Sequence, residues 1–144
     1  MSQMTASEVR AQSQSKTAVQ KSSTRTMLSP VNPIVQAGQR PRIELMGGVS
    51  WERLTAGAVE GLEFLQIEYA PGGSSGSAMS RHPGREFGYV LEGELSLELG
   101  FEHYMLHPGD SVVFNSTTPH RLTNASEQIM RAIWVIFDCP VEHK

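Results

Sequence analysis

Short stretches in which polar and apolar residues alternate constrain the fold of this chain most strongly. Across residues 94–99, three leucines alternate with Glu94, Ser96 and Glu98 without interruption. A period of two places the leucines on one face of an extended strand and the polar residues on the other face. This pattern predicts a half-buried β-strand and does not suit an α-helix.

Similar short segments follow one another through most of the chain. The other predicted strands cover residues 51–54, 62–69, 87–91, 103–106, 111–114, 120–123 and 129–137. Sequences typical of turns separate them, at residues 71–73, 92–93, 108–110 and 124–127. Because many short strands follow at close spacing and no strong amphipathic helix intervenes, we predict an all-β fold, an antiparallel sandwich or barrel.

The first 38 residues differ in composition from the rest. Ser, Thr and Gln dominate residues 1–26, and large apolar side chains are scarce there, so burial cannot offset the entropy lost on ordering. Prolines and a glycine between residues 30 and 41 then favour extended chain and turns. We predict a disordered arm over residues 1–38 and one folded domain over residues 39–144. A short helix opened by a capping box at residues 5–8 is the alternative for the arm.

Charge and cysteine content argue against several kinds of function. Of the 12 Lys and Arg residues, four lie in the arm, which holds one of the 15 Asp and Glu residues. The folded part is therefore acidic, and direct nucleic-acid binding is not expected, because affinity for phosphates comes mainly from basic residues. The single cysteine, Cys139, cannot form an intramolecular disulfide. Since no apolar run suits a membrane helix or a secretion signal, we predict a cytoplasmic protein that does not bind membranes.

Two of the five histidines, His82 and His120, lie beside prolines at the ends of predicted strands. A tight break, Pro83-Gly84-Arg85, separates His82 from Glu86 and can bring the two side chains onto one inner wall. Two imidazoles and one carboxylate can hold a divalent first-row metal and leave coordination positions open. The alternatives are structural or surface roles for the histidines and a surface ion pair between Glu86 and a neighbouring arginine.

These residues stand in an arrangement that resembles the first motif of the cupin family. That motif contains a glycine, a His-x-His pair, a glutamate after three or four intervening residues, and a further glycine after six more. Here Ser80-Arg81-His82 is followed by Glu86 and, after six intervening residues, by Gly93. The spacing from Glu86 to Gly93 fits the family pattern.

A second stretch resembles the second cupin motif. It contains Pro108-Gly109-Asp110, then Pro119-His120, and after three more residues Asn124. Together the two motifs cover about residues 70–137. The resemblance implies a double-stranded β-helix, the jelly-roll or cupin barrel, with both motifs contributing to one internal site.

One position departs from the family pattern. Ser80 stands where the first motif has its first histidine, and the neutral hydroxyl of serine is a weak ligand for first-row metals. The resemblance implies a site for one divalent metal, zinc, iron, manganese or nickel, that retains three of four ligands: His82, Glu86 and His120. A pocket without metal is the alternative.

Longer stretches of the sequence resemble one particular group of cupin domains. Residues 81–93 and 114–121 are similar to the effector-binding cupin domain of bacterial regulators that carry a helix-turn-helix of the xenobiotic-response-element type, and residues 42–55 resemble that group as well. In those regulators the DNA-binding helices precede the cupin, whereas the first 38 residues here offer only the Ser/Gln-rich arm. We therefore expect either a stand-alone relative or a regulator without its DNA-reading part.

Strand parity predicts which side chains face the pocket. With Glu86 inward, Gly88 and Val90 share its face, and their small size is expected to leave room for a ligand. If Arg131 faces outward, Trp134 faces inward, as an aromatic wall of the cavity or as core filling. The predicted ligand-binding residues are Ser80, His82, Glu86, His120 and Trp134.

The other face of the same strand carries Phe87, Tyr89 and Leu91. Three large apolar side chains on an outer face predict a covered surface, and the simplest cover is a second copy of the chain, so a homodimer is expected.

Two functions follow from this pocket. The first is a sensor-like or carrier protein that binds a small molecule. The second is a metal-dependent dioxygenase or isomerase that uses the same His, Glu and His side chains. A purely structural protein would leave the convergence of polar residues unexplained.

Overall fold

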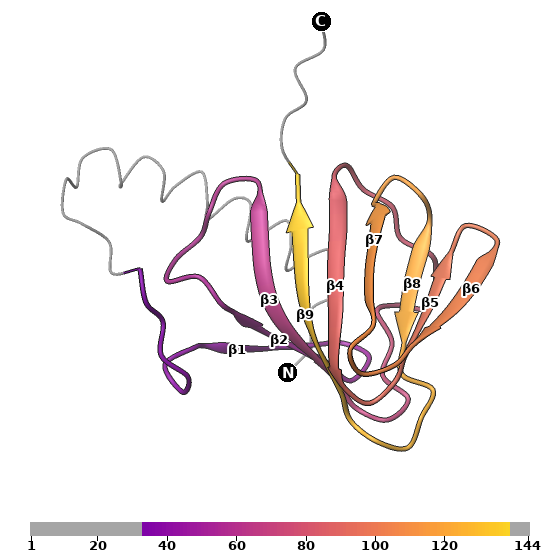
Figure 1. The fold of residues 1–144 in the computed structure, drawn as a ribbon, viewed down its shortest axis with the longest axis horizontal. Coiled ribbons are helices and arrows are strands. Elements are labelled where there is room, and N and C mark those ends of the chain that lie inside the picture. The colour runs from indigo at the N-terminus through magenta and orange to yellow at the C-terminus, as the bar shows by residue number, and fades with distance from the viewer. Residues whose placement is uncertain (1–32, 139–144) are drawn as a thin grey trace, which may run out of the picture.

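Residues 33–138 are described by a computed structural model of the chain. Within this range all regular structure is β-strand (Figure 1), which confirms the predicted all-β class. The strands are β1 (Arg42–Leu45), β2 (Val49–Arg53), β3 (Leu62–Tyr69), β4 (Arg85–Glu92), β5 (Leu95–Leu99), β6 (Glu102–Leu106), β7 (Ser111–Asn115), β8 (His120–Thr123) and β9 (Met130–Phe137). Among these residues no helix is long and apolar enough to cross a membrane.

Two antiparallel sheets make up the domain. The larger has the order β1-β2-β3-β9-β4-β7, and the smaller has the order β6-β5-β8. The last strand, β9, lies between β3 and β4 in the middle of the larger sheet, as the yellow strand in Figure 1 shows. Residues near the end of the chain therefore reach the centre of the domain.

Alternation along the strands builds the core between the sheets. In β3, β4 and β9, inward side chains such as Leu65, Val90 and Trp134 are buried, and their sequence neighbours are more exposed. The smaller sheet contributes Leu95 and Leu97, which are fully buried in the same cluster. Full burial of one such side chain stabilises the fold by about 1.5 to 3 kcal/mol.

The ends of the predicted strands lie within two residues of the observed ends, and one observed strand was not predicted. Residues 42–45 were not predicted as a strand, yet they form β1, in which Ile43 pairs with Trp51 of β2. The predicted disordered arm falls mostly on residues 1–32, which together with Cys139 lie outside the described residues.

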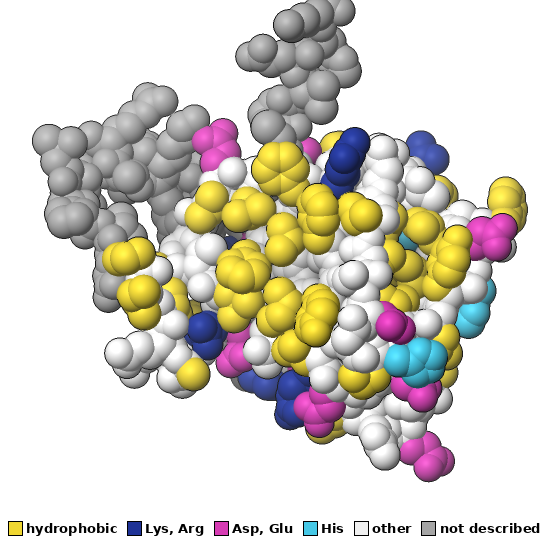
Figure 2. All heavy atoms as spheres, in the orientation of Figure 1, with side chains coloured by type: hydrophobic (Ala, Val, Ile, Leu, Met, Phe, Trp, Pro, Cys, Tyr) yellow, Lys and Arg dark blue, Asp and Glu magenta, His cyan; other side chains and the backbone are white. Residues whose placement is uncertain are grey.

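The outer face of the larger sheet carries a row of apolar side chains. Phe64 of β3, Val135 of β9, Phe87 of β4 and Val113 of β7 are direct neighbours across four strands. Figure 2 shows apolar side chains gathered on this side of the molecule. We call the apolar outer face the set Phe64, Phe87, Tyr89, Leu91, Val113, Val135 and Phe137.

Candidate metal centre

Backbone pairing brings three distant segments together at one end of the core. Ser80 and His120 exchange two backbone hydrogen bonds of 2.8 Å, which joins the segment before β4 to the start of β8. Next along this segment, the His82 N–H donates to the Ser116 carbonyl at 3.0 Å, and the Ser116 N–H donates to the Gly84 carbonyl at 2.9 Å. These bonds place His82 and His120 beside β4, which carries Glu86.

Gly84 makes the tight turn between His82 and Glu86 possible. Its φ of +104° lies in a region that favours glycine. A Cβ atom at this position would lie 2.3 Å from the carbonyl oxygen of Phe137. A larger residue would therefore push the His82 segment away from the sheet.

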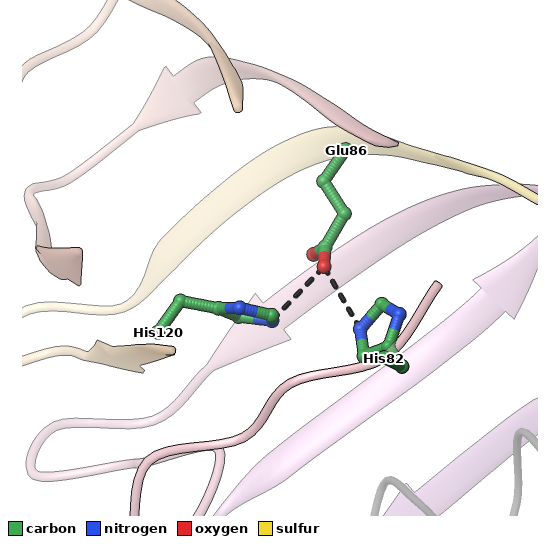
Figure 3. Close-up of side chains that lie close together, drawn as sticks. All are labelled: His82, Glu86 and His120. Carbon is green, nitrogen blue, oxygen red and sulfur yellow. Dashed lines mark ion pairs between the residues drawn. The ribbon is translucent and has the colours of Figure 1, made fainter. Parts of the chain in front are cut away.

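The three side chains converge on one carboxylate oxygen (Figure 3). The Nε2 atoms of His82 and His120 each lie 3.0 Å from Oε2 of Glu86. One ligand atom from each residue lies within 4.8 Å of the other two. The side chains of Glu86 and His120 are 4% and 7% exposed, whereas that of His82 is 22% exposed.

The hydrogen bond made by Nδ1 shows which nitrogen of each histidine ring carries the proton. Nδ1 of His120 lies 2.8 Å from the Thr118 carbonyl oxygen, and Nδ1 of His82 lies 3.2 Å from the Pro83 carbonyl oxygen. Because a carbonyl oxygen only accepts hydrogen bonds, each Nδ1 donates its proton there. A neutral imidazole then directs its Nε2 lone pair at Glu86. Three lone pairs facing one another require a cation between them, either a metal ion or added protons.

Two further side chains hold the carboxylate in place. The indole Nε1–H of Trp134 donates to Oε1 of Glu86 at 2.8 Å, and the Ser116 hydroxyl donates to Oε2 at 3.0 Å. Burial raises the pKa of Glu86. When protons rather than a metal ion lie between the rings and the carboxylate, hydrogen bonds from the two histidines, the charge of His120 and the hydrogen bond from Trp134 hold this pKa well below the usual range. Glu86 is therefore ionised, and only Oε2 faces the histidines.

The arrangement fits a divalent metal. Metal bonds to imidazole nitrogen and carboxylate oxygen are about 2.1 Å long, so two such atoms at right angles lie about 3.0 Å apart. Both nitrogen-to-oxygen distances to Glu86 have this value. Two imidazoles and one carboxylate suit zinc, iron, manganese or nickel and leave positions open for a further ligand.

The remaining predicted residues lie around the same centre. Ser80 and Trp134 line a cavity together with the three converging side chains. The room expected above Gly88 is not available, because a Cβ atom at this glycine would lie 2.1 Å from the Trp134 ring. Gly88 instead lets the indole reach Glu86.

Ser116 was missed by the sequence reasoning. Continued alternation from the inward-facing Phe114 would have placed it on the inner side, where it is fully buried. Tyr69 and Ser75, which also line the cavity, were missed because Tyr69 lies outside both motifs and serines are common in this loop.

Comparisons with known proteins agree with the fold. The family profile described as a cupin domain matches residues 65–136. The HTH-type transcriptional regulator PuuR of Escherichia coli is 40% identical over 65 residues, which are 45% of this chain and 35% of the regulator. The match thus spans about a third of the length of this curated relative.

Solved structures show the same architecture. The cupin domain of an XRE-family transcriptional regulator from Enterobacter cloacae aligns with a TM-score of 0.56 and 24% identity, over 65% of this chain and 99% of that domain. The hydroxypropylphosphonic acid epoxidase of S. wedmorenis aligns with a TM-score of 0.64 and 24% identity, over 74% of this chain and 59% of the epoxidase. Both likenesses support the cupin barrel predicted from the two motifs.

Proposed function

The chain belongs to the cupin family, and from this membership we propose that it is a sensor-like domain that binds a small molecule next to a divalent metal ion. Zinc, iron, manganese and nickel are the candidate ions, held by His82, Glu86 and His120. The observation that carries the proposal is the convergence of two Nε2 atoms on Oε2 of Glu86, at 3.0 Å each, with both Nδ1 atoms directed at carbonyl oxygens. A bound metal would supply a Lewis-acidic point with open positions for the ligand.

The regulator-like sequence supports a sensing role. Effector-binding domains of regulators gain their effect from ligand binding, and the chain shares 40% of 65 aligned residues with PuuR. A cytoplasmic location, a separate arm over residues 1–38, and the absence of direct DNA binding by the acidic barrel remain parts of this proposal.

Metal content provides the direct test. Protein purified without added metal and then titrated in turn with zinc, iron(II), manganese(II) and nickel(II) should bind one ion per chain of at least one of these metals, as measured by elemental analysis after gel filtration. Native mass spectrometry of the same sample should reveal any small organic molecule that is retained. Failure to bind any of the four metals, while such a molecule remains bound in the presence of a chelator, would contradict the metal centre.

Ser80→His should tighten metal binding by about tenfold, which corresponds to about 1.4 kcal/mol. Ser80 is paired through its backbone with His120 and lines the same cavity, so an imidazole there supplies a fourth ligand. Competition with a chromogenic zinc chelator measures the change. Ser77→His, in the exposed part of the same loop, is the matched control and should have no effect. Equal affinities for all three proteins would show that position 80 does not face the metal.

Metal affinity should fall as the pH decreases through about 6. The lowered pKa of Glu86 keeps its carboxylate ionised in this range, whereas imidazole ordinarily takes up a proton near pH 6.5. Because metal and proton compete for Nε2 of two histidines, the affinity should drop by up to about a hundredfold per pH unit in acid. Titrations with zinc at pH 8, 7, 6 and 5 measure the slope. An affinity that stays constant down to pH 5 would assign the binding to carboxylates instead.

A metal-dependent enzyme is the second candidate function. Three protein ligands beside a cavity leave positions for both a substrate and oxygen, as two histidines and a carboxylate do in non-haem iron oxygenases. Oxygen consumption by the iron(II)-loaded protein, followed by analysis of the ligand, separates the two candidates. A ligand recovered unchanged supports the sensor, and a product that His120→Ala does not form supports the enzyme.

The apolar outer face should join two copies of the chain. Phe87 and Tyr89 are exposed on this face beside Val113, and contact with a second copy would remove them from water. We expect a particle of twice the 15.8 kDa chain mass in analytical ultracentrifugation. Phe87→Glu should weaken the dimer by at least about tenfold, as expected for a central aromatic side chain. Phe101→Glu, at the exposed β5–β6 turn, is the control, and a monomeric wild-type protein would contradict the dimer.

A further inference from the structure

The cavity beside the metal centre is small and mostly apolar. Its volume is about 70 Å³. Apart from the three converging side chains, its lining is uncharged and consists of Trp51, Leu65, Ile67, Tyr69, Ser75, Ser80, Leu122, Trp134 and Ile136. Burial, with the charge of Glu86, raises the pKa of Tyr69 above its usual value, so its hydroxyl is neutral and shares a hydrogen bond with Ser75. Among the described residues that line the cavity, none outside the three converging side chains can neutralise a second charge on a ligand.

Two charged side chains on the inner side of the larger sheet are paired with each other. Glu63 of β3 and Arg53 of β2 lie on the inner side of their strands, and their side chains form an ion pair at 3.7 Å. Neither residue lines the cavity. A charged group at the far end of a ligand would therefore meet apolar side chains such as Leu65 and Ile67.

The charge of the centre selects the charge of the ligand head group. A divalent ion together with ionised Glu86 and two neutral histidines carries one net positive charge. A head group with a single negative charge brings the buried site to zero. A second negative charge, or a positive charge elsewhere on the ligand, would be desolvated without a partner, which is costly in an apolar cavity.

The cavity is compact. Its volume of about 70 Å³ corresponds to the space that about five to seven water molecules need.

We propose that the ligand is a compact monoanion, with one carboxylate-like head at His82, Glu86 and His120 and an uncharged body against Leu65 and Ile67. This inference rests on the metal centre proposed above and goes beyond it by naming the ligand class. It excludes diamines, dicarboxylates and phosphorylated sugars as well-fitting ligands.

Three four-carbon acids test the charge rule directly. Butyrate, succinate and 4-aminobutyrate share the head group and carbon skeleton but end in a neutral, an anionic or a cationic group. They are titrated into the cobalt(II)-loaded protein, and the visible absorption of the metal reports binding. Butyrate should bind at least about tenfold more tightly than the other two, because only its tail enters the apolar cavity without losing charge hydration. Equal or tighter binding of succinate or 4-aminobutyrate would overturn the inference.

Enlarging the cavity tests whether the uncharged body of the ligand lies against Leu65. Leu65→Ala should raise the affinity for hexanoate relative to butyrate by at least about threefold, because the two extra methylenes of hexanoate can be buried in the space that the leucine side chain leaves. Leu95→Ala removes an equally buried leucine that does not line the cavity and should leave the ratio unchanged. An unchanged ratio in a folded Leu65→Ala protein would show that the body lies elsewhere. If cobalt is not bound at all, the metal centre itself fails, whereas bound cobalt with the wrong selectivity overturns only the ligand class.

Discussion

His120→Ala should lower the affinity for zinc by more than about a hundredfold and leave less than one ion per chain after gel filtration. Removing a residue that only orients a ligand already costs about 10- to 100-fold in affinity, and His120 is placed to bind directly. Its Nε2 lies 3.0 Å from Oε2 of Glu86, and the ring is fixed by the Thr118 carbonyl and by contact with Phe114. The two remaining side chains cannot surround an ion.

His107→Ala is the matched control for this experiment. His107 is an exposed histidine whose ring lies near Asp110 in a turn, and it is not among the three converging residues. Its replacement should leave zinc affinity and stoichiometry unchanged. If the two variants lose affinity equally, zinc is bound by surface histidines and the centre at Glu86 is wrong. Circular dichroism of both proteins confirms that the fold is retained.

Much of the fold could be predicted because a strand with one buried face carries apolar residues at every second position. In β5 and β9 the inward residues are apolar at every second position, so face and extent follow from the sequence. β1 was missed because it is short and polar at Arg42 and Glu44, and because it follows Pro41 in a region rich in turn signals. It is a strand because it pairs with β2 and buries Leu45, and such long-range pairing leaves no local pattern.

The converging residues could be predicted from spacing, but their hydrogen bonds could not. The motifs name Glu86, His82 and His120, and the structure brings these side chains to one point. The alternation of side chains along the strand also predicted that Trp134 faces inward. This alternation could not show that the indole lies over Gly88 and donates to Oε1 of Glu86, because that depends on the side-chain rotamer and on close packing between β4 and β9.

Trp134→Phe should weaken zinc binding by about 10- to 100-fold, the usual cost of losing a group that orients a metal ligand. The indole N–H donates a hydrogen bond to Oε1 of Glu86, so Oε2 is the oxygen that faces the histidines. Without this bond the carboxylate can rotate, and a buried charged oxygen loses its donor, which also destabilises the protein by about 1 to 3 kcal/mol.

Trp51→Phe separates this positioning role from simple packing. Trp51 is buried and lines the same cavity, so its truncation leaves a comparable void, but Glu86 keeps the hydrogen bond from Trp134. Both variants should melt at lower temperature, and only Trp134→Phe should lose zinc affinity. In the cobalt(II)-loaded proteins, the visible spectrum should change for Trp134→Phe and stay constant for Trp51→Phe. Equal losses of affinity in the two variants would show that Trp134 acts through packing alone, and that Glu86 keeps its orientation without the indole.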